Sequence, residues 1–69
     1  MRIIYTDHAR LRLNQNGLTE LEIEHALTYP KQVKKSFKDR MIAIGTVKNR
    51  EVKIVFVKRQ NYIKIVTIR

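Results

Sequence analysis

The sequence predicts an α+β fold: a short N-terminal strand and a helical hairpin packed on a four-stranded antiparallel β-meander. Apolar residues recur at helical spacing as far as Pro30, and after it they alternate or run continuously, which is typical of strands. The later segments are joined by very short turns, so consecutive strands should pair with each other. A chain of 69 residues is sufficient for one domain, spanning residues 1–69.

The first elements predicted are a strand at 2–5 and a helix at 7–16. The strand is a candidate for an added edge of the sheet. Thr6 or Asp7 can cap the helix by accepting hydrogen bonds from its first amides. Gly17 stands where a helix commonly ends in a left-handed residue. The residues expected on the buried side of this helix are Ala9, Leu11 and Leu13.

The second helix has the clearest local signal in the chain. Thr19-Glu20-Leu21-Glu22 is a capping box, with Thr19 as N-cap and Glu22 at the third helical position. Pro30 ends the helix. Its flanking apolar pair and buried stripe are expected to comprise Leu18, Ile23, Ala26 and Leu27.

The remaining chain is predicted to form four strands, at 32–37, 40–48, 51–58 and 62–69. The turns fall at 38–39, 49–50 and 60–61. Residues 52–57 and 63–66 are almost continuously apolar or β-branched, which favours central strands covered on both faces.

Positive charge dominates the second half of the chain. The protein has 15 Lys and Arg against 6 Asp and Glu, for a net charge of +9, and only Asp39 and Glu51 are acidic after residue 30. Such a field favours nucleic acid as the first candidate partner and an acidic protein as the second; an anionic membrane surface is a distant third. The apolar runs are far shorter than the roughly 20 residues that span a bilayer. With no signal peptide recognisable and no cysteine, we expect a soluble cytoplasmic protein.

Several kinds of site are excluded by residue type and spacing. His8 and His25 are the only histidines and fall on different predicted helices, without cysteines or acidic clusters at ligand spacing, so no metal site is expected. Gly17 and Gly45 are the only glycines, which excludes a phosphate-binding glycine loop, and no cofactor is expected. Because so short a chain buries a modest core, a homodimer or a bound partner is a candidate source of stability.

His8 and Arg12 are four residues apart and therefore share one face of the first helix. An imidazole can transfer the protons that RNA cleavage requires, and a guanidinium can clamp the phosphate. The alternative, which the residues alone favour, is that both side chains are solvated on an exposed helix face.

Basic residues of the strands form two further groups. Lys31, Lys34, Lys35, Lys38 and Arg40 could follow a phosphate backbone, or could protect a sheet edge from pairing with other strands. The second group could converge on one area of the sheet. Strict alternation separates Lys64 from Thr67 and Arg69, so a bulge would be needed to bring them to one face. This second group comprises Arg50, Lys53, Lys64, Thr67 and Arg69.

Two stretches resemble small bacterial proteins. The pattern His8-Ala9-x-x-Arg12, then Gly17-Leu18-Thr19, then Ala26-Leu27-x-x-Pro30, resembles a family of unassigned function grouped with the RelE-like toxins. Residues 40–69 are similar to the sheet of BrnT-type toxins, although Gln15-Asn16-Gly17 replaces the Lys-His-Gly common there. The resemblance implies a RelE-like fold and a metal-independent endoribonuclease, a toxin neutralised by an acidic antitoxin protein. The matching positions are His8 and Arg12, and more loosely Arg40, Arg50, Thr67 and Arg69.

Three functional hypotheses follow. The first is an RNA endonuclease of the toxin type, acting on free or ribosome-bound mRNA, with His8, Arg12, Arg50, Thr67 and Arg69 at the catalytic site. Its RNA-binding residues would be Lys31, Lys34, Lys35, Lys38, Arg40 and Lys53. The second is an RNA- or ribosome-binding module without catalysis. The third is a basic interaction domain for an acidic partner protein.

Overall fold

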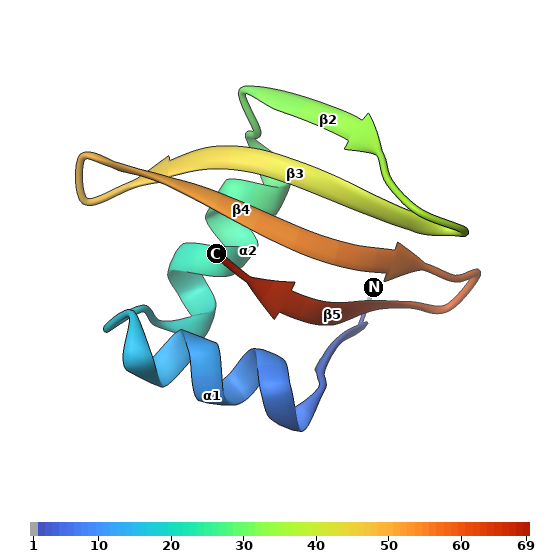
Figure 1. Cartoon of the computed structure of the whole chain (residues 1–69), viewed down its shortest axis with the longest axis horizontal. Coiled ribbons are helices and arrows are strands. Elements are labelled where there is room, and N and C mark those ends of the chain that lie inside the picture. Colours follow the sequence, from blue (N-terminus) through green and yellow to red (C-terminus); the bar gives the residue numbers. More distant parts are fainter. Residues whose placement is uncertain (1) are drawn as a thin grey trace.

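The computed structural model describes residues 2–69, which form two helices and one five-stranded sheet (Figure 1). The elements in chain order are β1 (Arg2–Tyr5), α1 (Asp7–Gln15), α2 (Glu20–Thr28), β2 (Gln32–Lys35), β3 (Arg40–Val47), β4 (Arg50–Lys58) and β5 (Tyr62–Ile68). The strand order across the sheet is β1-β5-β4-β3-β2. The α+β class is therefore confirmed.

The sheet differs from the prediction in having five strands of mixed direction instead of four antiparallel ones. Strands β2 to β5 form the predicted meander. The N-terminal strand pairs with β5 in parallel, with Arg2 opposite Tyr62 and Tyr5 opposite Ile65. The first strand thus joins the last, and it places the start of α1 beside β5.

Strand and turn positions agree with the prediction to within two residues. β2 ends at Lys35, because the chain then turns back through Ser36, whose amide donates to the carbonyl of Arg40. The turn between β3 and β4 lies at Lys48 and Asn49, one residue earlier than predicted. Both residues have positive φ, 52° and 64°, as a two-residue hairpin with the native strand twist requires.

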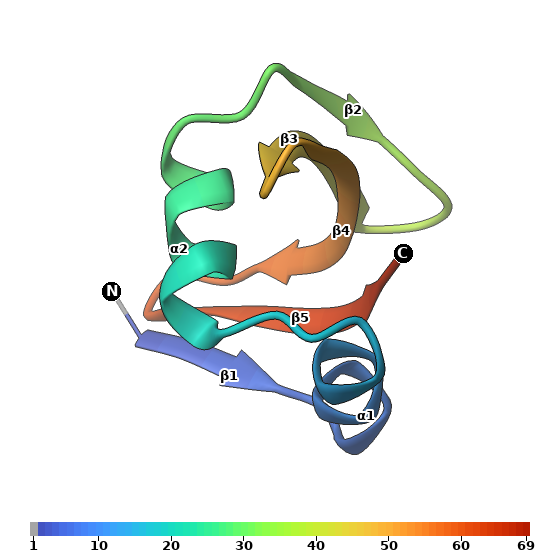
Figure 2. The same cartoon turned by 90° about the vertical axis from the view of Figure 1, so that its left-hand side faces the viewer.

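The predicted helical hairpin is corrected in one respect: each helix packs mainly on its own part of the sheet. Helix α1 lies against β5 and β1, whereas α2 lies on β3 and β4. Figure 2 shows the sheet curving around α2, with α1 beside the lower strands. Both helices therefore contribute to one core without pairing along their lengths.

The helix ends form as predicted. The Thr6 hydroxyl accepts from the amide of Ala9, and Thr19 and Glu22 form the reciprocal capping box. The hydrogen bonds that Glu22 accepts from Thr19 hold the pKa of this carboxyl below its usual value, first through the Thr19 backbone amide. Gly17 has φ of 64°, the left-handed conformation expected after α1.

The core lies between the two helices and the face of the sheet that they cover. Its members are Ala9, Leu13, Leu18, Ile23, Ala26, Ala43, Val47, Val52, Ile54, Phe56, Ile65 and Ile68. Leu11 was predicted to join them but is 53% exposed, since the buried side of α1 passes through Ala9 and Leu13. Gly45 lets α2 approach β3, because a β-carbon there would lie 3.0 Å from that of Ala26.

Candidate nucleic-acid interface

The face of the sheet that no helix covers, called the open face below, is the surface that meets the viewer in Figure 1. Three buried residues, Ile44, Val55 and Val57, lie outside the helix-covered core and belong to this face. Strand register places further side chains on the same side. On β3, β4 and β5 the open face comprises Arg40, Ile42, Ile44, Thr46, Glu51, Lys53, Val55, Val57, Tyr62, Lys64, Thr67 and Arg69.

A β-bulge in β5 decides which residues reach the open face. Val55 pairs with Thr67 and the next residue, Phe56, pairs with Ile65, so Val66 is one residue extra on β5. Ile65 and Ile68 can therefore both enter the core although they are three residues apart. A bulge was needed to bring Lys64, Thr67 and Arg69 to the same face, but its presence could not be predicted from the sequence. The bulge at Val66 brings the three residues together.

The cations that β3, β4 and β5 contribute to the open face lie in two rows across the strands. Arg40 pairs with Val57 and Val57 with Lys64, which gives the first row. Ile44 pairs with Lys53, and Lys53 exchanges both backbone hydrogen bonds with Arg69, which gives the second. The rows are four residues apart along β4, or about 13 Å. Between them lie Ile42, Val55 and Thr67.

The centre of the open face is apolar. Val55 and Val57 are only 4% and 8% exposed although no helix packs on them. The predicted cover on both sides of β4 is thus present, but on this side it consists of neighbouring side chains and not a second layer. Long Lys and Arg side chains can cover apolar surface with their methylene groups while the charged ends stay in water.

Helix α1 covers the edge of β5 beyond the point where β1 ends. The hydroxyl of Thr6 donates to the carbonyl of Val66 at 2.9 Å, and Arg12 Nε donates to the carbonyl of Ile68 at 3.2 Å. These carbonyls would otherwise be unpaired at the edge of the sheet. Arg12 therefore has a structural role, with its two terminal nitrogens left to face other groups.

His8 lies one turn before Arg12 and is exposed. Arg10 marks the opposite side of α1, because its guanidinium forms an ion pair with Glu20 at 2.8 Å and stacks over Tyr5. His8 and Arg12 therefore lie on the side of α1 turned away from α2. Within residues 2–69 the imidazole has no hydrogen-bond partner, and thus no group to orient it.

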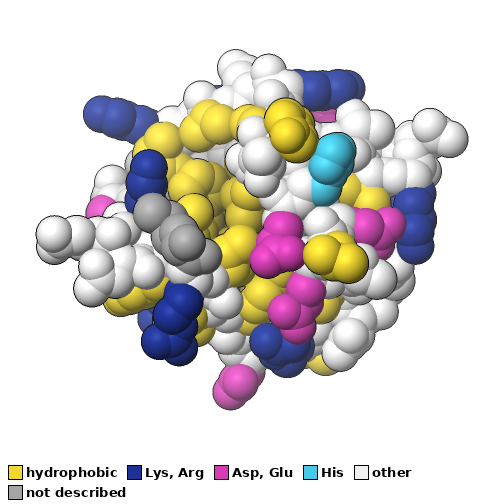
Figure 3. All heavy atoms as spheres, turned by 180° about the vertical axis from the view of Figure 1, so that it is seen from behind, with side chains coloured by type: hydrophobic (Ala, Val, Ile, Leu, Met, Phe, Trp, Pro, Cys, Tyr) yellow, Lys and Arg dark blue, Asp and Glu magenta, His cyan; other side chains and the backbone are white. Residues whose placement is uncertain are grey.

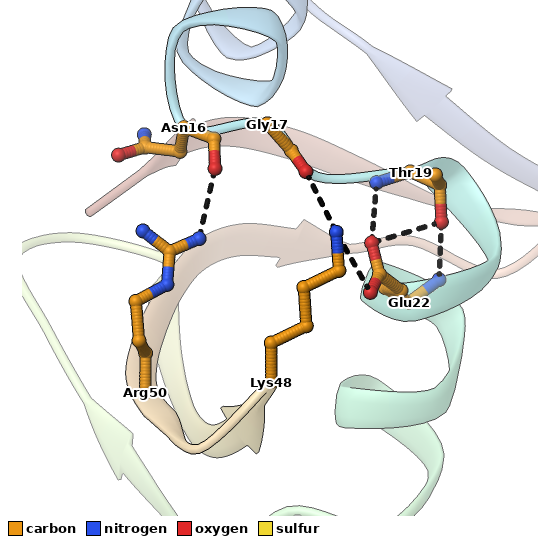
Figure 4. Close-up of polar contacts among 6 residues, drawn as sticks. All are labelled: Asn16, Gly17, Thr19, Glu22, Lys48 and Arg50. Atoms are coloured by element: carbon orange, nitrogen blue, oxygen red, sulfur yellow. Dashed lines mark hydrogen bonds and ion pairs between the residues drawn. The ribbon is translucent and has the colours of Figure 1, made fainter.

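Arg50 is held at the loop between the helices (Figure 4). Its Nη2 donates to the carbonyl of Asn16 at 2.8 Å, and Lys48 Nζ donates to the carbonyl of Gly17 at 3.2 Å and lies 3.7 Å from a carboxylate oxygen of Glu22. The β3–β4 hairpin thus fastens the connection between α1 and α2. Arg50 can act on a ligand only with the nitrogens that this contact leaves.

Arg50 and Arg69 meet at the C-terminal end of β5. They line a hollow of about 60 Å³ together with Asn16, Leu18, Glu51 and Val52. This volume holds roughly two water molecules and cannot enclose a nucleotide. The end of β5 can therefore present arginines to a phosphate only at its surface. The structure brings Arg12, Arg50, Thr67 and Arg69 to this end of the strand, whereas His8 lies toward the other end of α1.

The predicted RNA-binding residues are all exposed but do not form one surface. Register places Lys34, Arg40 and Lys53 on the open face, whereas Lys35 pairs with Met41 and points to the helix-covered side. Lys38 lies in the β2–β3 turn, with its ammonium 5.6 Å from the ring centre of Phe37, and Lys31 precedes β2. Lys64 was not among these candidates, because strict alternation separated it from Thr67 and Arg69.

The opposite face of the molecule carries acidic side chains, as Figure 3 shows. Helix α2 contributes Glu20, Glu22 and Glu24 there. Arg10 and Lys48 pair with Glu20 and Glu22, and Lys and Arg side chains are also present on this face (Figure 3), so a polyanion would be attracted more strongly to the open face than to the α2 side.

The described residues contain no group of three His, Asp or Glu side chains that could hold a metal ion. In residues 2–69, neither helix has the length and hydrophobicity that crossing a membrane requires.

Comparison with known proteins gives one match. The family model of a domain of unknown function, DUF4258, matches residues 5–69, and the chain therefore belongs to this family. No curated protein and no solved structure matches the chain.

Proposed function

We propose that this protein binds single-stranded RNA on the open face and cleaves it without a metal ion, as a toxin of the RelE- and BrnT-like type. The observation that carries the proposal is the bulge at Val66, which places Lys64, Thr67 and Arg69 on one face with Arg40 and Lys53. Lys64 and Arg69 belong to the two cationic rows and are therefore about 13 Å apart along the sheet. A short RNA segment laid along β5 would meet cations at both ends.

The open face has the chemistry that single-stranded nucleic acid requires. Charge neutralisation of phosphates supplies affinity that is independent of sequence, and apolar or aromatic surface accommodates the bases. Ile42, Val55 and Val57 supply the apolar part, and the two cationic rows supply the charge. On the opposite side α2 carries three carboxylates, which makes that side less attractive to the RNA strand than the open face.

In the proposed reaction a ribose 2′-oxygen attacks the adjacent phosphorus and the 5′-oxygen of the next nucleotide leaves. His8 accepts the proton of the 2′-hydroxyl, and its imidazolium returns a proton to the leaving oxygen. The products are a 2′,3′-cyclic phosphate and a 5′-hydroxyl. The free nitrogens of Arg12 stabilise the charge that develops on the phosphate oxygens, with Arg50 and Arg69 beside them.

In a toxin–antitoxin pair the antitoxin would be an acidic protein that covers this basic surface. RNA and such a protein would then compete for the same cations, so one partner excludes the other. The cytoplasm, where mRNA and ribosomes are found, is the proposed compartment.

A second candidate, RNA binding without cleavage, is favoured by the environment of His8. A general base is usually oriented by a third group, and within residues 2–69 none forms a hydrogen bond with this imidazole. Binding through the open face does not depend on His8 at all.

Cleavage of labelled single-stranded RNA in EDTA distinguishes the two candidates. We expect His8→Ala to lower the cleavage rate by about 10²- to 10⁴-fold while RNA binding, measured by fluorescence anisotropy, stays unchanged. His25→Ala is the matched control, because His25 lies on α2 near Leu21 and Lys48 and should leave both measurements unaltered. Binding without cleavage would establish the second candidate, and absence of binding would refute both.

A further inference from the structure

A hollow of about 260 Å³ opens at the first cationic row, at the end of the open face away from Arg69. Val57 and Val66 line it as apolar surface, and Thr6 contributes where α1 begins. Its volume is more than four times that of the hollow beside Arg50. The polar side chains that line it are Asp39, Arg40, Arg59, Tyr62 and Lys64.

The charge of this hollow is positive after its internal ion pair is counted. Arg59 donates to a carboxylate oxygen of Asp39 at 2.6 Å, and this hydrogen bond lowers the pKa of the Asp39 carboxyl. That pair is close to neutral. In the described chain neither Arg40 nor Lys64 has a carboxylate within salt-bridge distance, so two positive charges remain.

Register explains why the two charges lie beside the same hollow. Arg40 and Lys64 are the partners of Val57 on its two sides, in adjacent strands that lie about 4.8 Å apart. Their backbones are therefore about 10 Å apart, with a small buried side chain between them. Long side chains from both strands can reach a single anion above Val57.

The remaining lining residues fit a nucleotide. Tyr62 is half-buried at the start of β5, and the amide of Arg59 donates to its carbonyl across the turn at 2.9 Å, which fixes the tyrosine backbone. A phenol ring next to a phosphate site offers a stacking surface for a base of any kind.

From these contacts we infer a nucleotide subsite of single-stranded RNA in this hollow: Arg40 and Lys64 bind one phosphate, and the adjacent base stacks on Tyr62. The inference rests on the proposed RNA binding and deepens it, because it names residues that take no part in the proposed chemistry at His8. RNA that extends from the arginine end of β5 to this hollow would bind more tightly than RNA that reaches only one of them.

The test measures binding of a fluorescein-labelled uridine octamer over a range of salt concentrations. We expect the double variant Arg40→Gln/Lys64→Gln to bind at least tenfold more weakly at low salt and to lower the slope of log K against log salt by about 0.7, the value for one phosphate of a single strand. The control, Lys35→Gln/Lys58→Gln, removes the same charge from the helix-covered side, where Lys35 pairs with Met41 and Lys58 with Ile63, and should keep the slope.

Tyr62 supplies a second, independent measurement. Tyr62→Leu should weaken octamer binding by about 5- to 100-fold, whereas Tyr62→Phe, which keeps the ring, should retain it. Circular dichroism of each variant checks that the fold is intact.

The outcomes separate this inference from the proposed function. Equal losses in the double variant and its control would overturn the subsite while leaving RNA binding in place. The subsite would also be overturned if Tyr62→Leu bound the octamer as tightly as the wild type and the Arg40→Gln/Lys64→Gln variant kept the wild-type salt slope. If the wild-type protein bound no octamer at all, both the subsite and the proposed function would fall.

Discussion

The side chain of Tyr5 places a hydroxyl group that lacks a hydrogen-bond partner at the small core. Its hydroxyl is buried and has no hydrogen-bond partner within residues 2–69. The guanidinium of Arg10 lies 5.0 Å from the ring centre, on its face. Burial, with smaller contributions from Glu20 and Glu24, raises the pKa of the phenol to about 12. The folded state therefore disfavours the phenolate.

We predict that Tyr5 makes the fold sensitive to alkali. The unfolded phenol ionises near pH 10 and the folded one only near 12. The contribution is fully present below pH 10, and the free energy of unfolding should fall as the pH rises from 10 to 12. Tyr5→Phe removes this loss and leaves no unsatisfied hydroxyl, so its stability at pH 7 should be unchanged or higher by up to ~1 kcal/mol. Urea denaturation of both proteins across this pH range measures the difference. Parallel curves for the two proteins would contradict the assignment to Tyr5.

The β3–β4 hairpin combines a strained turn with a fastening contact. Lys48 and Asn49 both have left-handed φ, which costs a non-glycine residue energy. Lys48 compensates by bonding the carbonyl of Gly17 and approaching Glu22. The turn thus places the side chain that holds the loop between α1 and α2.

Asn49→Gly should stabilise the protein by up to ~1 kcal/mol, because glycine adopts φ of 64° without steric cost. Lys48→Gly relieves the same kind of strain but loses the contacts with Gly17 and Glu22, so we expect a smaller gain or a loss. Thermal unfolding of both variants measures the contrast. If the Lys48 variant proved the more stable of the two, the fastening role would be wrong.

Elements with local signals could be predicted from the sequence. The capping box of α2, Gly17 after α1, and the meander after Pro30 all depend on residues within a few positions of each other. The pairing of β1 with β5 joins residues about 60 apart, and nothing in Arg2–Tyr5 states its partner. The exposure of Leu11, which was predicted to be buried, has a similar cause, since the position of β5 decides which side of α1 is buried.

The candidate site was predictable in composition but not in arrangement. Arg40, Lys53, Thr67 and Arg69 were identified by type and do share a face. Lys64 joins them only through the bulge, and the Arg59–Asp39 ion pair that shapes the hollow links residues 20 apart. Arg12 and Arg50 were expected to face a phosphate, yet one nitrogen of each guanidinium donates a hydrogen bond to a backbone carbonyl. Side-chain spacing along the chain cannot indicate such contacts.

The whole molecule combines a net charge of +9 with a group of cations close together on the open face. Cations on neighbouring strands of the open face repel each other at short range, whereas the ion pairs Arg10–Glu20, Lys48–Glu22 and Arg59–Asp39 attract. Exposed ion pairs contribute little to stability. Repulsion within the open face should therefore be the larger effect.

Added salt should accordingly stabilise this protein. Raising the ionic strength from about 10 mM to 150 mM shortens the screening length from about 30 Å to 8 Å, which weakens repulsion between the two cationic rows. We predict a higher urea midpoint at the higher ionic strength with an unchanged denaturant slope. Lys64→Gln should reduce the salt effect, and Lys58→Gln should reduce it less. A midpoint that falls with salt would mean that the ion pairs dominate.

The bulge that accommodates the extra residue of β5 decides on which face of the sheet the last three residues lie. If β5 kept all its residues but ran without the bulge, Ile68 would turn outward to water and Thr67 and Arg69 would be buried against the helices. Deleting Val66 would instead join Ile65 directly to Thr67, and plain alternation would then leave Thr67 and Arg69 on the open face and Ile68 in the core. The strand can therefore lose this one residue, whereas the same residue without its bulge would invert the end of the protein.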